Sequence, residues 1–529
     1  MTNERNNLPS SRSAPTWAQP AFPPDTFTQT YVPVQELECT GVPLTETVYL
    51  TVGGGLGSFA WVDHLRIFGA RADQVVVLGP DPLPHARFER LCRHSQIPPH
   101  ERIRSNSDAC PDNIWGWPGY AVREFWYSLQ QHDFRNAARV LWQVFNEPTF
   151  AETYTPRAGD VYAAIEREAD RVGWSRMWRN GWVHAIRKTD DGRYVVAYSQ
   201  TKPGKGSRDR LIIAQYVHVA VGHPRVRVLP DVQQYRARTG DRRSVVNAYE
   251  PHEHIYAHLL DHGGVVLVRG RGIVASRIIQ RLHELRTHNP NIAILHLLRS
   301  PLAAGQRYGR LERRAEHHWE FQVFNWPKAC WGGEFRAKLE QANDQERDQL
   351  LDEWGGTTTA RRADWVKIID RGLREGWYQI RFGDLYRVEC APAGTLLTII
   401  RGQGAIQDAT RLCVDFIIDC TGLEPAADRN PLLRDLLTHY RAARNPKGRL
   451  KVANSFEVIG MANGAGRMYA SGAPAFGGSF APVDSFLGLQ YAALCSVEAL
   501  AELRAPGLRP LTSLRSIMQW IAWARGVAP

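Results

Sequence analysis

The sequence predicts an α/β protein with two Rossmann-like dinucleotide-binding domains, because one chain pattern occurs twice at well-separated places. The first copy is "VYLTVGGGLGSFAWVDHLRIFG", residues 48–69, and the second is "VVLVRGRGIVASRIIQRLHEL", residues 265–285. In each copy a β-branched strand leads through a glycine-rich turn into a helix with apolar residues at helical spacing. Two such turns predict that the chain holds two nucleotides.

Size and composition agree with this prediction. A chain of 529 residues is too long for one compact core, and its 43% hydrophobic and 22% charged residues are ordinary for a globular protein. No apolar run is long enough to span a bilayer, and residues 1–27 lack the apolar segment of a secretory signal. The eight cysteines include no C-x-x-C pair, which excludes the usual dithiol and zinc-ribbon sites.

From these properties we expect a cytoplasmic protein with no membrane and no nucleic-acid partner. The net charge of +11 is spread along the chain and leaves an acidic protein partner open.

The first turn has the spacing of a pyrophosphate-binding loop. Gly53 permits the sharp turn, Gly55 lets the backbone approach the pyrophosphate, and Ser58 lets the helix pack closely on the strand. The backbone N–H groups of Leu56 and Gly57, at the start of the helix, face the anion. The turn therefore predicts a site for a dinucleotide phosphate.

The strand that follows this helix, "QVVVLG", completes a β-α-β unit but ends without the usual acid. A carboxylate at that position normally binds the ribose hydroxyls. Gly79 stands there instead, and we expect Asp81, two residues later, to take its role.

The second turn repeats the pattern with Gly270, Gly272 and the pair Ala275-Ser276, and its helix places Ile273 and Arg277 near the expected phosphates. The strand after this helix, "NIAILHLLRS", ends in Arg299 and Ser300 rather than in an acid.

A guanidinium beside a hydroxyl pairs with the 2′-phosphate of NADP, whereas a carboxylate would repel it. The second site is therefore expected to prefer NADPH to NADH. The alternative is that Arg299 is a solvated loop residue.

Three further motifs accompany the two turns. "VAVGHP" at 219–224 lies between the turns, "DCTG" at 419–422 follows the second turn, and "ASGA" at 470–473 precedes a terminal helix. In this order the motifs resemble those of the two-dinucleotide-binding-domain (FAD/NAD(P)) flavoproteins, and among them the flavin-dependent monooxygenases and N-hydroxylases. The resemblance covers residues 48–500. It implies FAD at the first turn and NADPH at the second, with the NADPH domain inserted in the FAD domain.

The expected division of the chain follows from this resemblance and from local composition. Its parts are a disordered or extended N-terminal arm (1–45), an FAD domain in two pieces (46–240 and 405–505), an NADPH domain (241–404) with a Trp-rich insertion (306–365), and a C-terminal helix (506–529). The insertion either caps a substrate or packs one domain on the other. The C-terminal helix carries an apolar stripe that would dock on either domain or on a second subunit in a homo-oligomer, namely Leu514, Ile517, Trp520 and Ile521.

The resemblance also implies further cofactor-binding residues. Those expected at FAD, beyond the first turn and Asp81, are Ser105, Asn106, Thr421, Gly422, Gly472, Ala473 and Pro482. Trp115 is a further candidate neighbour of the flavin ring. No catalytic side chain is predicted, because the flavin itself supplies the chemistry. No metal site is predicted either, because His252, His254 and His258 fall on a linker helix and His317 and His318 at the surface.

Three departures from the family pattern imply weak FAD binding or a loss of catalysis. Gly79 replaces the ribose acid, and Ala473 replaces the aspartate of a late "GD" pair. The monooxygenase fingerprint "FxGxxxHxxx(W/Y)" does not occur.

The resemblance favours an NADPH-dependent FAD-containing oxidoreductase. Its first expectation is a monooxygenase that oxidises a small nitrogen- or sulfur-containing molecule through a flavin hydroperoxide. Two alternatives stay open: a flavoprotein reductase that passes electrons to an acidic protein carrier, and a non-catalytic dinucleotide-binding sensor or scaffold.

Overall fold

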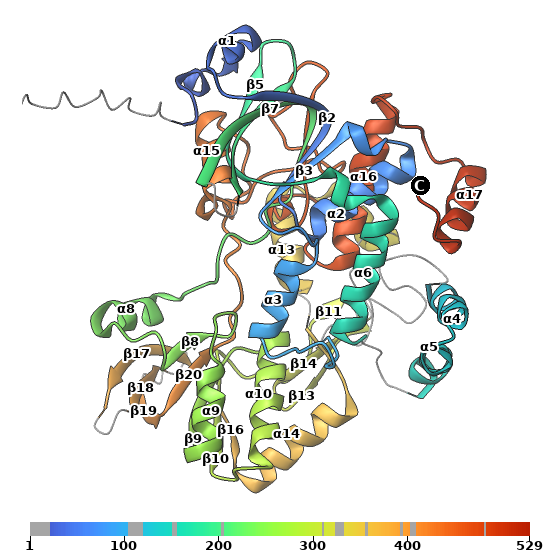
Figure 1. Cartoon of the computed structure of the whole chain (residues 1–529). Coiled ribbons are helices and arrows are strands. Elements are labelled where there is room, and N and C mark those ends of the chain that lie inside the picture. Colours follow the sequence, from blue (N-terminus) through green and yellow to red (C-terminus); the bar gives the residue numbers. More distant parts are fainter. Residues whose placement is uncertain are drawn as a thin grey trace, which may run out of the picture.

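The computed structural model describes residues 22–103, 120–150, 156–202, 206–308, 311–322, 333–354, 358–391, 395–401, 409–480 and 483–529. These residues form two units, each built around its own sheet, and the chain passes between the units twice (Figure 1). The two glycine turns lie in different units.

The first unit contains an eight-stranded mixed sheet in the order β1-β5-β6-β7-β2-β3-β4, with β21 paired to β7. Strands β2, β3, β7 and β21 pair in parallel, whereas β5, β6 and β7 form an antiparallel meander. The strands are β1 (Tyr31–Val32), β2 (Leu44–Val52), β3 (Val75–Gly79), β4 (Trp178–Asn180), β5 (Trp182–Thr189), β6 (Tyr194–Lys202), β7 (Gly206–Val219) and β21 (Arg467–Ala470).

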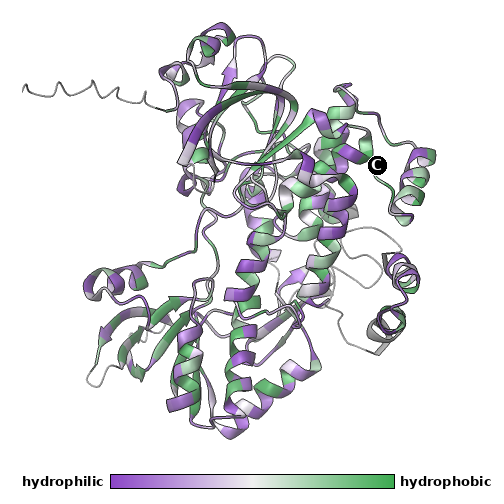
Figure 2. Ribbon diagram, in the orientation of Figure 1, coloured by the Kyte–Doolittle hydropathy of each residue, from purple (hydrophilic) through white to green (hydrophobic). Residues whose placement is uncertain are grey.

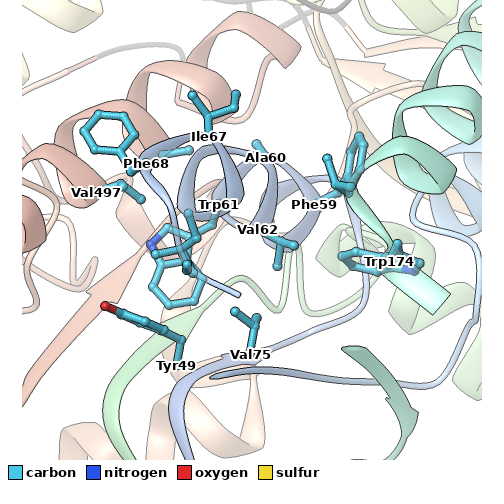
Figure 3. Close-up of a cluster of buried hydrophobic side chains, with 14 of the residues drawn as sticks. Tyr49, Phe59, Ala60, Trp61, Val62, Ile67, Phe68, Val75, Trp174 and Val497 are labelled. Carbon is cyan, nitrogen blue, oxygen red and sulfur yellow. The ribbon is translucent and has the colours of Figure 1, made fainter. Parts of the chain in front are cut away.

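Helices cover both faces of this sheet. On one face, Trp61 and Phe59 of α2 are buried against Tyr49, Val75 and α16 (Figure 3). Neighbouring residues of β3 point to the other face, where α15 packs, so the strand is buried on both sides. The helices of this unit are α1 (Val34–Cys39), α2 (Leu56–Phe68), α3 (Ala86–His94), α4 (Tyr120–Gln130), α5 (Phe134–Phe150), α6 (Ala158–Val172), α7 (Trp174–Met177), α15 (Pro431–His439), α16 (Phe486–Glu502) and α17 (Ser513–Ala524).

The N-terminal segment corrects one expectation. Residues 25–45 are folded rather than being a disordered or extended arm, because Phe27, Val32 and Leu37 are buried against β5, β6 and β7. Strand β1 pairs with β5, and α1 follows it directly.

The second unit contains a five-stranded sheet, all parallel, in the order β16-β10-β9-β20-β8. The strands of this sheet are coloured as hydrophobic in Figure 2, as expected of a sheet buried on both faces. The strands are β8 (Val245–Asn247), β9 (Gly264–Arg269), β10 (Ile292–Leu298), β16 (Tyr378–Phe382) and β20 (Phe416–Asp419).

One face of the second sheet is covered by helices and the other by a small antiparallel sheet. The helices of the unit are α8 (Pro230–Thr239), α9 (Glu253–His262), α10 (Ile273–Arg286), α12 (Gly333–Gln341), α13 (Asp344–Trp354) and α14 (Ala363–Glu375). The antiparallel sheet consists of β17 (Asp384–Cys390), β18 (Leu396–Arg401) and β19 (Ala409–Val414). Short strands of the Trp-rich insertion are β11 (Arg307–Tyr308), β12 (Leu311–Glu312), β13 (Arg314–Glu316), β14 (Trp319–Gln322) and β15 (Thr359–Ala360).

The two crossings between the units run beside each other. The outward crossing follows β7 and the return crossing follows β20, and Val226 and Leu423 form a β-bridge between them. The structure places the outward crossing before α8, which packs with β17, rather than at residue 241. It places the return crossing after β20 rather than at residue 405.

The described part of the Trp-rich insertion packs one unit on the other. Asp344 and Asp352 of α13 accept hydrogen bonds from Lys451 (2.6 Å) and Lys447 (2.8 Å), which belong to the first unit. Trp319 and Trp365 are buried against the second sheet. The "VFNWP" part of the insertion lies outside the described residues.

Candidate functional site

The first turn is enclosed by the carboxyl ends of three strands. Gly53 has φ +107°, and a Cβ there would collide with the Ala220 carbonyl that follows β7. A Cβ at Gly57 would lie 2.7 Å from Oγ of Ser471, which follows β21. At Gly55, by contrast, a Cβ would meet nothing within 4 Å. The turn is therefore closed on the protein side and open where the N–H groups of α2 begin, as a pyrophosphate site requires.

A chain of hydrogen bonds fixes the carbonyl of the first glycine. The Ser58 hydroxyl donates to the Gly53 carbonyl, and Thr51 Oγ1 donates to Ser58 Oγ (2.8 Å). Since Thr51 has one proton to give, His218 Nδ1 (2.9 Å) must donate to it.

His218 therefore carries a proton on Nδ1, and its lowered pKa keeps the ring neutral near pH 7. Burial lowers the pKa of His218 to about 3, and its ring stacks on Trp61 with centroids 4.8 Å apart. Sequence reasoning missed Thr51 and His218, although both lie on the two strands that flank the turn.

Gly79 is explained by the close approach of the first turn. A Cβ at Gly79 would collide with the backbone N and Cα of Gly54. The strand therefore has no room for the usual acid in this backbone. Asp81 does not stand free to replace it, because Arg90 of α3 donates to its two oxygens at 3.1 and 2.8 Å.

The loop between β21 and α16, called here the late loop, also reaches the first turn. The Ser471 amide donates to the Val219 carbonyl (3.2 Å), and Gly472 (φ +68°) and the buried Ala473 follow. Oγ of Ser471 is buried and has no hydrogen-bond partner among the described residues. An unpaired buried hydroxyl beside an open phosphate-type turn fits a bound FAD. Ser105, Asn106, Trp115 and Pro482 lie outside the described residues.

The second turn has the same closed and open sides as the first, but a different side chain donates to the carbonyl of its first glycine. Gly270 has φ +119°, and a Cβ there would lie 2.9 Å from the Cys420 carbonyl, whereas a Cβ at Gly272 would meet nothing within 4 Å. Nε2 of His296, on the neighbouring strand β10, donates to the Gly270 carbonyl at 2.5 Å.

His296 is the middle of a second hydrogen-bond chain. The Tyr378 hydroxyl donates to Nδ1 of His296 (2.7 Å) and accepts from Trp319 Nε1 (3.1 Å). Burial lowers the pKa of His296 to about 4, and its ring stacks on Trp319 with centroids 4.9 Å apart. Sequence reasoning missed this histidine, which is the one polar residue in the "AILHLL" run.

The residues expected at NADPH fall into two groups. Ile273 begins α10, and Arg299 and Ser300 follow β10 at the same sheet edge as Gly272. The Arg299 side chain is 78% exposed and lies 3.9 Å from Asp384, so it is free to turn toward a phosphate.

Ser276 and Arg277 point elsewhere. Ser276 Oγ donates to the Ile273 carbonyl and lies 3.1 Å from the Thr359 hydroxyl. The buried Arg277 donates to the Gln96 carbonyl and to Glu284 (2.6 Å), so it ties the two units together.

Arg271, between the two glycines, was not predicted as a site residue. It donates to the Ser300 carbonyl, and its Nε is buried without a hydrogen-bond partner among the described residues. Burial lowers its pKa. A second arginine beside the open turn fits a nucleotide phosphate. The signal in the sequence was a charged residue at the variable position of the G-x-G element.

Thr421 and Gly422 lie beside the second turn, since they follow β20, the strand next to β9. The Thr421 amide donates to Oδ1 of the buried Asp419 (2.8 Å), and burial raises the pKa of that carboxyl. The Gly422 carbonyl accepts from Arg227 of the outward crossing (3.3 Å). The "DCTG" motif therefore joins the second turn to the paired crossings.

His223, in "VAVGHP", connects three segments at this junction. Its Nδ1 lies 3.3 Å from the Glu424 carbonyl and its Nε2 lies 3.3 Å from Oδ2 of Asp484. Arg87 of α3 donates to the Val221 carbonyl (3.1 Å) and to the His223 carbonyl. The outward crossing, the return crossing and the late loop are thus held at one place.

In the described ranges, no group of three or more His, Cys, Asp or Glu side chains is placed to hold a metal ion. His252 bonds the Glu250 carbonyl and the Tyr256 hydroxyl, and His317 pairs with Asp370 (2.6 Å).

Comparison with solved structures identifies the fold. The ornithine hydroxylase of Pseudomonas aeruginosa superposes with a TM-score of 0.57 at 15% identity, over 85% of this chain and 98% of that one. The ornithine N-hydroxylase of Kutzneria sp. 744, solved with reduced FAD, NADP+ and L-ornithine, gives 0.59 at 13% identity, over 87% and 100%. The FAD-bound cadaverine monooxygenase of Erwinia amylovora gives 0.60 at 13% identity, over 88% and 96%.

The chain has the fold of the N-hydroxylating flavoprotein monooxygenases. The two-dinucleotide-domain architecture expected from the glycine turns is confirmed by these superpositions. No protein-family model matches the sequence, and no curated protein matches it.

Proposed function

We propose that the chain is an NADPH-dependent, FAD-containing monooxygenase that oxidises an amine nitrogen of a small molecule. The observation that carries the proposal is the pair of open glycine turns, each at the carboxyl ends of parallel strands, in a fold that matches N-hydroxylating enzymes over nearly their whole length. Solved proteins with this fold include enzymes named for ornithine, lysine and cadaverine as substrates. These substrates share a primary amine on an aliphatic chain.

The residues present fit the two cofactors at the turns. FAD would be held by the open side of Gly55, by the N–H groups that begin α2, and by Ser471. NADPH would be held by Gly272, the start of α10, Arg271 and Arg299. Bound flavin supplies the redox chemistry, which takes reducing equivalents from the nicotinamide and activates dioxygen. The chain itself contributes orientation and exclusion of water.

The test uses the two positions where a side chain has room. Gly55 (φ −96°) and Gly272 (φ −80°) have backbone angles open to any residue, and a Cβ at either meets nothing within 4 Å. Gly55→Val and Gly272→Val should therefore fold and fill the space that the phosphates need. We expect purified wild-type protein to show a flavin absorption band that NADPH bleaches without air.

The two variants should fail differently. Gly55→Val should lose the flavin band, whereas Gly272→Val should keep it and resist reduction by NADPH. When air is readmitted, the rate of oxygen consumption should be higher in the presence of ornithine, lysine or cadaverine than in the absence of an amine. A wild-type protein that takes up no flavin contradicts the proposal, and so does a reduced flavin whose oxygen use no amine changes.

One observation favours a second candidate, a non-catalytic dinucleotide-binding sensor. A side-chain carboxylate that could bind the ribose is sterically excluded at position 79, and the Asp81 carboxylate is paired with Arg90. A protein that binds NADPH, measured calorimetrically, but takes up no flavin would support this candidate.

A further inference from the structure

The C-terminal helix α17 leaves an outward apolar stripe of Leu514, Ile517 and Met518 uncovered. Trp523 is fully buried, where its Nε1 donates to Glu168 (3.1 Å) and its ring lies under Arg123 of α4 (4.6 Å). The opposite side of the helix is exposed, with Leu514 at 71%, Ile517 at 56% and Met518 at 58%. Trp523 holds the helix on the first unit together with Ala524, which packs beside it, and Arg515, which donates to the Phe68 carbonyl (3.4 Å). A stripe at helical spacing faces outward.

The segment that carries this stripe is strongly basic. Residues 503–529 contain Arg504, Arg509, Arg515 and Arg525 and no aspartate or glutamate. Trp520 is exposed beside the stripe. The helix thus presents aliphatic residues outward with an exposed tryptophan beside them, carries Arg515 in its first turn, and is bordered by Arg509 and Arg525. Helices that lie in the plane of a lipid surface combine apolar and basic residues in this way.

A hollow of about 460 Å³ opens beside the start of α17. It is lined by Gly69, Arg71, Gln74, Gly507, Arg509 and Arg515. Arg515 donates to the carbonyls of Arg509 (2.6 Å) and Pro510 (2.8 Å), and Arg71 pairs with Asp73 (3.0 Å). The described carboxylates leave the positive charges of Arg509 and Arg515 unneutralised, so the hollow suits an anionic group.

We propose that α17 and this hollow dock on the surface of an anionic lipid bilayer, with the apolar stripe in the headgroup region and the arginines on lipid phosphates. Charge decides between a bilayer and a second copy of the chain. Two-fold pairing of α17 would bring its arginines against those of the partner with no acidic residue of the segment to offset them, and the chain already carries a net charge of +11. An anionic surface offers the opposite charge.

This proposal revises the expectation that the chain has no membrane partner. That expectation rested on the lack of a spanning segment, and no described helix is long and apolar enough to cross a membrane. A helix lying on the surface does not need such length. The hollow is at the Gly69 end of α2, roughly 20 Å from the glycine turn at 1.5 Å per helical residue, so docking leaves that turn open.

The experiment is sedimentation of the full-length protein with phosphatidylcholine vesicles, with and without phosphatidylglycerol. The variants are Ile517→Glu with Met518→Glu, which removes the stripe, and Arg509→Glu, which removes a cation of the hollow. Leu260→Glu, an exposed apolar residue of α9, is the matched control. All of these side chains are exposed, and thermal unfolding checks that each variant is folded.

We expect sedimentation with the anionic vesicles, little with the neutral ones, and release by salt. The Arg509→Glu variant should partition about fivefold more weakly or worse, the stripe variant should lose binding, and the control should bind as wild type.

Three results would overturn the proposal: no binding to anionic vesicles, equal binding to both kinds, or equal binding of the stripe variant. A lipid-free dimer that the stripe variant dissociates would also overturn it, in favour of a second copy.

Discussion

The two glycine turns are held in the same conformation by different side chains. In each, the carbonyl of the first glycine accepts a hydrogen bond from a chain that includes a buried neutral histidine stacked on a tryptophan. In the first turn two hydroxyls relay between His218 and the carbonyl, whereas in the second His296 reaches it directly. The surroundings differ more. The first turn is walled by β7 and β21, while the second borders the crossings and the exposed Arg299.

This difference teaches where each nucleotide's specificity can reside. At the first turn the following strand comes so close that only glycine fits at its end, so contacts must come from elsewhere. At the second turn the end of β10 is open, and the residue that follows it, Arg299, carries a positive charge.

The largest expected effect comes from restoring the missing acid. Gly79→Asp should destabilise the first unit by about 3 kcal/mol or more, because its Cβ collides with the Gly54 backbone. The equivalent change at the second turn, Arg299→Asp, should fold normally and shift preference from NADPH toward NADH. Chemical unfolding and coenzyme KM values measure the two effects. A stable Gly79→Asp protein with tighter FAD binding would show that the comparison is wrong.

The next effect is a loss of stability in acid. His218 and His296 have pKa values lowered to about 3 and about 4, so the folded protein keeps them neutral while the unfolded chain takes up protons below about pH 6.5. Stability should therefore fall as the pH falls from 6.5 to about 4, by up to ~1.4 kcal/mol per pH unit for each histidine.

Chemical unfolding at several pH values measures this slope, and His296→Gln should make it shallower. Stability that stayed constant or rose between pH 6.5 and 5 would contradict the neutral assignment.

A smaller effect, confined to one turn, is expected from His296. His296→Phe leaves the Gly270 carbonyl without its donor, which costs about 1–3 kcal/mol. We expect a raised KM for NADPH and an unchanged flavin content. His296→Gln, which keeps an N–H donor, should recover part of the KM. A flavin loss equal to the NADPH effect would mean that the residue acts on the whole fold rather than on the second turn.

The smallest effect separates Ser58, at the third position of the first turn, from Ser276, one residue past the third position (Ala275) of the second turn. Ser58→Ala removes the donor to the Gly53 carbonyl and should weaken FAD binding about fivefold, for a bond worth about 1 kcal/mol. Ser276 bonds the Ile273 carbonyl instead, so Ser276→Ala should leave the NADPH KM unchanged. Equal effects of both changes would remove the distinction between the turns. Flavin release and steady-state kinetics provide the two measurements.

Sequence reasoning succeeded where the cause was local. Gly53 and Gly270 were identified because a sharp turn after a strand demands a positive φ, which neighbouring residues reveal. The two-unit architecture followed from the repeated strand, turn and helix. Phe27, Val32 and Leu37 were missed because their partners lie on β5, β6 and β7, far along the chain.

The site residues that were missed depend on contacts between distant elements. His218 and His296 read as ordinary members of buried strands, and their roles appear only when Thr51 and Gly270 are beside them. The pairing of Asp81 with Arg90 depends on how α3 is placed after the strand. The membership of β20 in the second sheet depends on its partners β8 and β9.

The nesting of one unit inside the other sets an order of assembly during synthesis. Every strand of the second sheet has left the ribosome before β21 and α16 are made. The second unit can therefore mature while the first remains unfinished, because domains fold as units when their sequence is complete. Ser471, which closes the first turn, is added near the end. Under the proposed function, flavin is therefore expected to bind only after β21 is made, and a protein truncated before β21 is expected to bind nicotinamide coenzyme but no flavin.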